Sequence, residues 1–298
     1  MTYNLIAIIG ATASGKTQTA VKVANVIGSE IISADSRQVY RGMDLGTGKD
    51  LDEYGTTPYH LIDICDPGDS YDVYRFQQDF YRTFQTLQER NKLGILCGGS
   101  SLYISAIINQ YDLHAAPVDK TLRNKLKNLS LDELQKYLLN IDAEQHNSTD
   151  MLDKGRLIRA IEIAEATAAD TQTLAHPQLS PLVIAIMWPR EERRARIKQR
   201  LQERLDAGMV AEIEALHHAG ISWQKLEYFG LEYRFVAQYL QKQLSYNDMF
   251  QKLNTAIAKF AKKQDTWLRK LEREGTKIHW VEGGEDQINT TLDIVKST

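Results

Sequence analysis

The sequence predicts an α/β fold in which helices flank a parallel sheet that carries a phosphate-binding loop, with a mainly helical insertion domain. Residues 5–9 (LIAII) form an unbroken apolar run closed by Gly10, which is typical of a buried parallel strand. Similar runs recur at residues 30–34, 93–97 and 182–187, with helical patterns between them. Between residues 114 and 180 the strand-like runs disappear. We therefore expect a core of residues 1–113 and 181–298 and a helical insertion of residues 114–180.

The composition is typical of a globular protein of the cytoplasm. Of the 298 residues, 43% are hydrophobic and 25% are charged, and no apolar run is long enough to cross a bilayer. Residues 1–4 show no signal-peptide pattern. Cys65 and Cys97 lie in different expected elements, so neither a disulfide framework nor a zinc site is indicated. We expect a cytoplasmic protein that does not contact a membrane.

The charge is unevenly distributed along the chain. A formal net charge of −3 argues against a general nucleic-acid binder. Lysine and arginine nevertheless concentrate in residues 190–204 and 259–277. Such runs are found on solvated helix faces and on surfaces that bind anions, and charge alone does not separate the two.

The loop after the first strand matches G-x-x-x-x-G-K-[ST], and residues 18–27 then have a helical pattern. In such a loop, backbone N–H groups and a helix N-terminus surround a phosphate, and Lys16 adds a full positive charge. The Thr17 hydroxyl can bind a Mg²⁺ ion that bridges phosphate oxygens. An ordinary glycine-rich turn would not need Lys16 beside Thr17. We expect the phosphate-binding residues to be Gly10, Ala11, Thr12, Ala13, Ser14, Gly15, Lys16 and Thr17.

The second expected strand, residues 30–34, ends at Asp35. In an open α/β sheet, ligands bind at the carboxyl ends of the strands, beside the phosphate loop. A carboxylate there can hold Mg²⁺, orient a water molecule or accept a proton. Asp35 followed by Ser36 is also good turn-capping chemistry, and both interpretations stay open at this point.

Residues 36–49 have little apolar periodicity and three glycines, which favours a binding loop over a core element. Arg37 and Gln38 carry the donors and acceptors that a base edge or a phosphate requires. A third strand is expected at residues 59–64, with His60 in a structural role, and a turn at residues 66–69.

A helix is expected at residues 73–90, because Phe76, Phe80 and Phe84 recur at core-facing spacing. The strand at residues 93–97 runs into a second glycine-rich turn, Gly98-Gly99-Ser100, which can approach a phosphate or a base. The insertion shows leucines at helical spacing and places Arg156 and Arg159 on one helix face. After the strand at residues 182–187 come helices at residues 190–205 and 208–216 and a last strand near residues 277–281.

Four segments together resemble the tRNA isopentenyltransferase family, whose members are tRNA dimethylallyltransferases that prenylate the adenosine next to the anticodon. They are residues 10–17, 33–44 (SADSRQVYRGMD), 60–64 and 98–103. The second segment is the most specific, because nucleoside kinases share the phosphate loop but not this block. The helix with the pattern R-I-x-x-R at residues 196–200 is also similar. The resemblance covers nearly the whole chain.

The resemblance implies transfer of a dimethylallyl group from its diphosphate to the exocyclic amine of adenine. It implies that the phosphate loop and Arg200 bind the diphosphate, with Mg²⁺ on Thr17, and that Asp35, Ser100 and Lys16 act in catalysis. It implies a tRNA anticodon stem-loop as partner, dimethylallyl diphosphate as donor, and a monomeric enzyme. The implied tRNA-binding residues are Asp35, Ser36, Arg37, Gln38, Ser100, Arg123, Arg156 and Arg159.

Several positions depart from the family pattern. Ala11 stands where the family has proline, and Ser100-Ser101 replaces Thr-Gly. A His-Pro-Asn-Asp motif is missing at residues 150–153, and residues 230–233 (GLEY) replace Gly-Tyr-Lys-Glu.

Three other functions use the same features. A small-molecule or nucleotide kinase would bind ATP on the phosphate loop and use Asp35 as base toward a hydroxyl group. A prenyltransferase that acts on free adenine nucleotides would lack affinity for tRNA. A non-catalytic RNA-binding module would not need Lys16, Thr17 and Asp35 intact.

Overall fold

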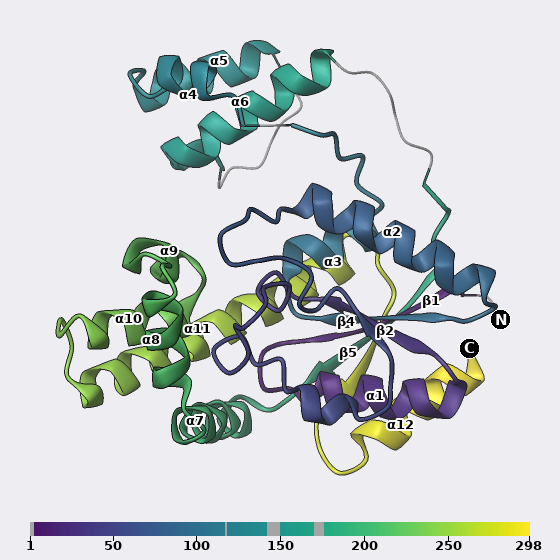
Figure 1. Ribbon diagram of the computed structural model, residues 1–298. Helices are drawn as coiled ribbons and strands as arrows, with labels where there is room; N and C mark the ends of the chain where they lie inside the picture. The colour runs from purple at the N-terminus through teal and green to yellow at the C-terminus, as the bar shows by residue number, and fades with distance from the viewer. Residues whose placement is uncertain (1–2, 117, 142–149, 170–175) are drawn as a thin grey trace. The chain divides into compact units, whose positions relative to one another are not determined.

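The computed structural model describes residues 3–116, 118–141, 150–169 and 176–298 (Figure 1). The chain forms two compact units, residues 1–110 with 177–298 and residues 111–176. The expected insertion, residues 114–180, covers most of the second unit. No helix of the described residues combines the length and the apolar character needed to cross a membrane.

The first unit is built on a six-stranded parallel sheet with strand order β3-β2-β4-β1-β5-β6. This confirms the predicted parallel sheet flanked by helices. The strands are β1 (Leu5–Gly10), β2 (Glu30–Ala34), β3 (Tyr59–His60), β4 (Gly94–Gly98), β5 (Pro181–Met187) and β6 (Ile278–Glu282). The carboxyl ends of β1, β2 and β4 lie side by side, because Gly98 of β4 pairs with both Ile9 and Ala34. Ligands of open α/β sheets bind at this edge.

Helices cover both faces of the sheet because alternate side chains of β1 point to opposite sides. Leu5, Ala7 and Ile9 pack in one apolar cluster, and Ile6 and Ile8 pack in the other. On the first face lie α2 (Val73–Glu89), α3 (Ser101–Ile108) and α11 (Tyr246–Arg273). On the second face lie α1 (Lys16–Ile27) and α12 (Gln287–Ser297), drawn below the sheet in Figure 1.

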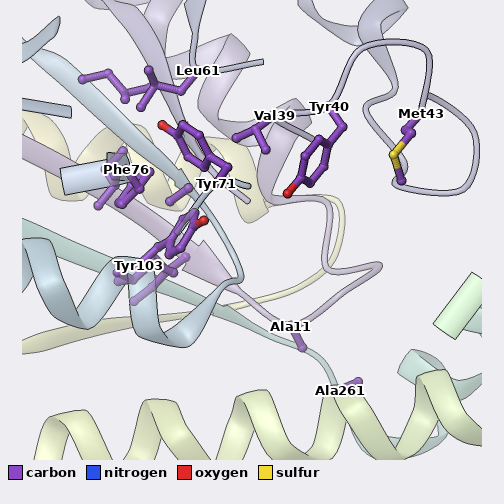
Figure 2. Close-up of a cluster of buried hydrophobic side chains, with 14 of the residues drawn as sticks. Ala11, Val39, Tyr40, Met43, Leu61, Tyr71, Phe76, Tyr103 and Ala261 are labelled. Carbon is purple, nitrogen blue, oxygen red and sulfur yellow. The ribbon is translucent and has the colours of Figure 1, made fainter. Parts of the chain in front are cut away.

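The phenylalanines of α2 lie in the core, as their spacing predicts. Phe76 stacks on Tyr103 of α3 with ring centroids 4.1 Å apart, and Figure 2 shows this pair beside Tyr71. Burial of such large rings gives the strongest apolar stabilisation per residue. These contacts fix α3, and therefore the turn before it, against the sheet.

Four further helices surround the carboxyl edge of the sheet. They are α7 (Arg190–Asp206), α8 (Met209–His218), α9 (Trp223–Tyr228) and α10 (Leu231–Leu240). Buried Ile197 and Leu201 join α7 to the same cluster that contains Phe229 and Tyr233. A short 3₁₀ helix, η1 (Leu51–Tyr54), follows the loop of residues 36–50.

The third strand is shorter than predicted. It ends at His60 because Leu61 and Asp63 adopt left-handed backbone conformations, with φ of 62° and 56°, which a strand does not permit. The side chain of His60 contacts Glu30 at 2.8 Å, in agreement with a structural histidine.

A buried carboxylate lies at the opposite, amino end of the sheet. Glu30 contacts three basic side chains, Arg90 at 2.9 Å, Lys92 at 2.7 Å and His60 at 2.8 Å. Burial alone would raise the pKa of Glu30, but the hydrogen bonds from these partners outweigh it and lower the pKa from 4.5 to about 2.

The second unit is helical, with α4 (Lys120–Leu126), α5 (Leu131–Ile141), the 3₁₀ helix η2 (Asp150–Leu152) and α6 (Lys154–Ala169). Its own apolar cluster contains Leu126, Leu134, Leu138, Leu157 and Ile161. The leucines that recur at helical spacing therefore pack inward.

Candidate active site

The phosphate loop leaves β1 at Gly10 and enters α1 at Lys16. Ala13 and Gly15 have left-handed backbone conformations, with φ of 61° and 79°. A side chain at Gly10 would lie 2.8 Å from the Ser14 hydroxyl and 2.9 Å from the Ile186 carbonyl, so the tight turn requires glycine there. The N-terminus of α1 thus lies beside the loop, which is the arrangement that binds anions.

Two side chains from distant elements hold the loop in this conformation. Trp188 donates from Nε1 to the Ser14 carbonyl at 3.0 Å, and Arg196 donates from Nε to the Ala13 carbonyl at 2.9 Å. The Arg196 guanidinium also lies 4.2 Å from the centre of the Trp188 ring. Both hydrogen bonds use carbonyl groups of the loop as acceptors and take up none of its N–H groups.

Gln264 of α11 joins the two glycine-rich turns. Its Oε1 accepts a hydrogen bond from the Thr12 backbone N–H at 2.9 Å, and its Nε2 donates to the Gly99 carbonyl at 2.8 Å. The side chain is buried, so both bonds are shielded from water. The sequence pattern did not identify Gln264, because its partners lie 252 and 165 positions away in the chain.

Lys16 lies among groups of both signs. Burial lowers the pKa of its ammonium group, while Asp35 and Asp50 act in the opposite direction. Its Nζ donates to the Ala11 carbonyl at 3.4 Å. A charged lysine that is partly desolvated interacts strongly with an anion placed beside it.

Asp35 both caps a turn and lines a cavity. Its Oδ1 accepts from the Arg37 backbone N–H at 2.9 Å, which is the capping role that the sequence left open. The hydroxyl of Ser100, the residue before α3, accepts from the Ser36 backbone N–H at 2.9 Å. Ser101 is the first residue of α3, so this position does not need the conformational freedom of glycine.

Gln38 and Arg37 make contacts within the first unit. The Gln38 amide accepts from the Ser33 hydroxyl at 3.0 Å and donates to the Gly48 carbonyl at 2.9 Å. Arg37 lies 5.3 Å from the centre of the Tyr228 ring, on an exposed aromatic side chain. Gln38 therefore fixes the loop of residues 36–50, and the roles of both side chains in RNA binding stay predictions.

Two further residues fix the same loop and were missed from the sequence. Glu212 of α8 accepts hydrogen bonds from the backbone N–H groups of residues 44, 45 and 46, at 3.0, 2.6 and 3.1 Å. Buried Lys49 donates to the Tyr40 carbonyl and pairs with Asp44 and Asp63. The run of glycines signalled a loop but did not show what holds it.

Arg200 and Arg204 lie one turn apart on α7 and face the loop. Arg200 forms an ion pair with Asp50 and also donates to the Gly48 carbonyl at 3.5 Å. Arg204 lies 3.6 Å from Asp50. Burial raises the pKa of Asp50, but the two arginines outweigh that effect and lower it overall.

Two cavities meet at the phosphate loop. The larger one, about 620 Å³, is lined by the loop, by Asp50 and by the arginines of α7. The smaller one, about 260 Å³, is lined by Asp35, Gln38, Ser100 and aromatic rings such as those of Tyr54, Phe229 and Tyr233. Lining residues common to both are Lys16, Thr17, Arg200 and Arg204. One chamber therefore suits a polyanion and the other a flat, partly polar group.

The oxygen donors beside Thr17 fit Mg²⁺, which prefers hydroxyl, carboxylate and phosphate oxygens. Asp50, Asp52 and Glu53 line the same cavity as Thr17. The described residues hold no cluster of three or more histidine, cysteine or acidic side chains that would bind a metal unaided. A Mg²⁺ ion would therefore need phosphate oxygens from a ligand.

In the second unit, two of the three expected tRNA-binding arginines share one buried carboxylate. Arg123 donates to both oxygens of Glu162 at 2.7 Å, and Arg159 contacts the same carboxylate at 3.3 Å. Burial would raise the pKa of Glu162, but these partners outweigh it and lower the pKa overall. Arg123 therefore joins α4 to α6, whereas the Arg159 contact with Glu162 lies within α6. The backbone N–H of Arg156 donates to Asp153 at 2.9 Å. Contact of the three arginines with tRNA stays a prediction.

Comparison with known proteins gives consistent matches. The family model described as IPP transferase matches residues 38–271. A tRNA dimethylallyltransferase 1 of Geotalea uraniireducens is 50% identical over 296 residues, which cover 99% of this chain and 98% of the relative. A tRNA dimethylallyltransferase 2 of Syntrophotalea carbinolica is 49% identical over 298 residues, all of both chains.

Solved structures give the same picture. The tRNA isopentenylpyrophosphate transferase of Bacillus halodurans has a TM-score of 0.73 and 30% sequence identity, with 99% of this chain and 96% of that chain covered. A eukaryotic dimethylallyltransferase acting on tRNA has a TM-score of 0.82 over 98% of this chain and 78% of its own. At 20% identity, this second structure supports the fold alone.

Proposed function

The chain belongs to the IPP transferase family, and from that premise we propose that it transfers a dimethylallyl group to tRNA. The donor is dimethylallyl diphosphate, and the acceptor is the exocyclic N6 amine of the adenosine on the 3′ side of the anticodon. The observation that carries the proposal is the pair of cavities that meet at Lys16 and Arg200. One can hold a diphosphate while the other holds an adenine.

The diphosphate binds to the phosphate loop of residues 10–17 in this proposal. Lys16, Arg200 and the N-terminus of α1 offset the negative charge that grows on the leaving diphosphate as the allylic C–O bond breaks. Mg²⁺ bound to Thr17 and to phosphate oxygens would add further positive charge at the leaving group. If so, Thr17→Ala raises the Mg²⁺ concentration needed for half-maximal rate.

Asp35 is the proposed proton acceptor. The adenine N6 attacks the allylic carbon, a C–N bond forms, and the proton lost from N6 passes to the Asp35 carboxylate. Its hydrogen bond from Arg37 leaves carboxylate oxygen lone pairs available for this task. Ser100 contacts the backbone of Ser36, the residue after Asp35, and this contact supports the proposal that Ser100 positions the attacking amine.

The acceptor base must leave the stack of the anticodon loop to reach the smaller cavity. Enzymes that act on a base commonly extrude it into a pocket and stack it against apolar or aromatic side chains. Phe229 and Tyr54 line this cavity and supply such surfaces. Because all the groups named lie in one chain, we propose a monomer, and because its substrate is tRNA, we propose that it works in the cytoplasm.

The structure allows a sharp test of the proposed base. Asp35→Asn keeps an oxygen that can accept from the Arg37 N–H but cannot take up a proton, whereas Asp35→Ala loses both functions. Unmodified tRNA is incubated with dimethylallyl diphosphate and Mg²⁺, and its nucleosides are analysed by mass spectrometry. We expect wild-type protein to form prenylated adenosine and Asp35→Asn to slow the single-turnover rate by about 10²- to 10⁴-fold.

Asp66→Asn, which changes an exposed carboxylate paired with Arg41, serves as control and should react normally. Product that persists in Asp35→Asn at the wild-type rate would remove Asp35 as base and leave the function intact. No product from folded wild-type protein would contradict the function. Transfer to free adenosine monophosphate, or ATP turnover with small acceptors, would then favour the two alternative enzymes.

A further inference from the structure

Arg204 lies at the junction of the two cavities and has no role in the mechanism above. Arg196, Arg200 and Arg204 are spaced four residues apart on α7, so they follow one face of the helix. Of the two arginines beside Asp50, Arg204 is the more buried, with 12% of its side chain exposed against 28% for Arg200. It lines both cavities.

The three guanidinium groups differ in how many of their N–H groups have a hydrogen-bond partner in the protein. Arg196 donates to the phosphate loop, and Arg200 pairs with Asp50 and donates to the Gly48 carbonyl. The Nε and Nη2 groups of Arg204 are buried, and neither has a hydrogen-bond partner among the residues that the structure describes. A buried N–H group without an acceptor is costly, so these donors call for an acceptor such as a ligand, an ion or an ordered water molecule.

The loop is shaped to admit this side chain. A methyl group at Gly48 would overlap the Arg204 guanidinium, and Gly48 has a left-handed φ of 64°. Only glycine satisfies both conditions at this position. The missing side chain at Gly48 therefore leaves the space that the Arg204 guanidinium occupies.

Two carboxylates face the same cation from other elements. Asp50 lies 3.6 Å from Arg204, and Glu232 of α10 lines the smaller cavity with it. Burial and the nearby Arg200 lower the pKa of Arg204, while Asp50 and Glu232 raise it.

We propose that Arg204 is a second arginine that binds the diphosphate of the prenyl donor, together with Lys16 and Arg200. The inference rests on the proposed function, because it assumes that the ligand of the larger cavity is a diphosphate. The guanidinium contributes planar N–H donors that match phosphate oxygens, and its position at the junction orients the donor toward the base cavity. Its loss therefore weakens donor binding more than tRNA binding.

The test uses inorganic pyrophosphate as probe, with Mg²⁺ and without tRNA, and measures its dissociation constant by titration calorimetry. Arg204→Gln should weaken pyrophosphate binding by about 10- to 100-fold, the effect of losing charge-assisted hydrogen bonds. Arg204→Lys, which keeps the charge and loses the fork, should lie between this variant and wild type. Arg194→Gln removes an exposed arginine from the same helix and should leave the dissociation constant unchanged.

A second pair of variants tests the geometry. Gly48→Ala should weaken pyrophosphate binding in the wild-type background, because the methyl group displaces the guanidinium. In the Arg204→Ala background, the same change should have a smaller effect, since the guanidinium is gone. This non-additivity separates displacement of Arg204 from strain in the backbone, which is present in both backgrounds.

Two results would overturn the inference. One is a folded Arg204→Gln protein that binds pyrophosphate within about twofold of wild type, whatever its melting temperature. That outcome would make Arg204 only a counter-ion for Asp50 and Glu232. The other is full additivity of the Gly48 and Arg204 changes. Wild-type protein that binds pyrophosphate and prenylates no tRNA would contradict the proposed function and not this inference.

Discussion

The carboxylate of Glu212 gives the strongest prediction outside the cavities. It accepts three consecutive backbone N–H groups of the loop and a fourth hydrogen bond from Tyr233 Oη at 2.8 Å. A side chain at Gly46 would lie 2.6 Å from the Tyr233 ring, so the loop packs directly on α10. Glu212 therefore ties the loop that carries Gly48 and Asp50 to the C-terminal helices.

Glu212→Gln keeps the shape and changes only charge and donor pattern. One carboxylate oxygen becomes an NH₂ group, so at least one backbone N–H faces a donor and loses its acceptor. Hydrogen bonds to charged groups contribute about 1.5–3 kcal/mol, and an unsatisfied buried donor costs about 1–3 kcal/mol. Because Glu212 is half-buried, we expect a loss of about 2–3 kcal/mol in the free energy of unfolding.

The functional consequence follows from the loop. Arg200 depends on Gly48 and Asp50 for its position. If the loop must become ordered when dimethylallyl diphosphate binds, the cost of ordering reduces the binding free energy of this donor. If about 1.4 kcal/mol of the loss appears there, the KM for dimethylallyl diphosphate rises about tenfold while kcat changes less.

Urea unfolding monitors the stability of this variant, and initial rates over a range of donor concentrations monitor KM. Glu214→Gln, an exposed glutamate on the same helix, is the matched control. A Glu212→Gln protein whose unfolding free energy and donor KM both equal those of Glu214→Gln would show that the three backbone contacts do not position the loop.

Three further changes test the rest of the framework. The pKa of Glu30 is lowered in the folded state, so its carboxylate stabilises the protein above pH 4.5 and loses this effect as the pH falls toward about 2. Glu30→Gln should therefore lower the free energy of unfolding by about 3 kcal/mol at pH 7 and by much less near pH 2. Urea titrations at both pH values measure this, and Arg82→Ala in an exposed pair should show little effect. Gln264→Leu keeps the side-chain volume and removes both hydrogen bonds between the glycine-rich turns, so the affinity for pyrophosphate should fall by about tenfold. An unchanged affinity would show that these two hydrogen bonds do not shape the phosphate loop. Glu162→Gln should destabilise the second unit by about 2–4 kcal/mol, seen as faster amide exchange in α4 and α6, and equal exchange rates would contradict the shared-carboxylate arrangement.

Local sequence determined much of the sheet and the phosphate loop. The run of residues 5–9 and the glycine-lysine pattern after it identify a strand, a turn and a helix start, because each depends on neighbouring residues. The phenylalanines of α2 predict their own burial for the same reason. The third strand was predicted too long because left-handed residues after His60 are not visible in an apolar pattern.

Tertiary structure alone decided which distant side chains complete the site. Glu212, Gln264 and Arg204 look like ordinary helix-surface residues in the sequence, where charge and spacing show only which face of a helix they share. Their partners lie more than 150 positions away, and the packing of α11 on β1, of α7 on α11 and of α8 on α7 brings them together. Arg123 and Arg159 show the converse, since a pattern that signals a basic surface is used in part to bind a buried glutamate. A local pattern records propensity and periodicity, whereas a hydrogen bond between distant segments depends on where the whole chain places both ends.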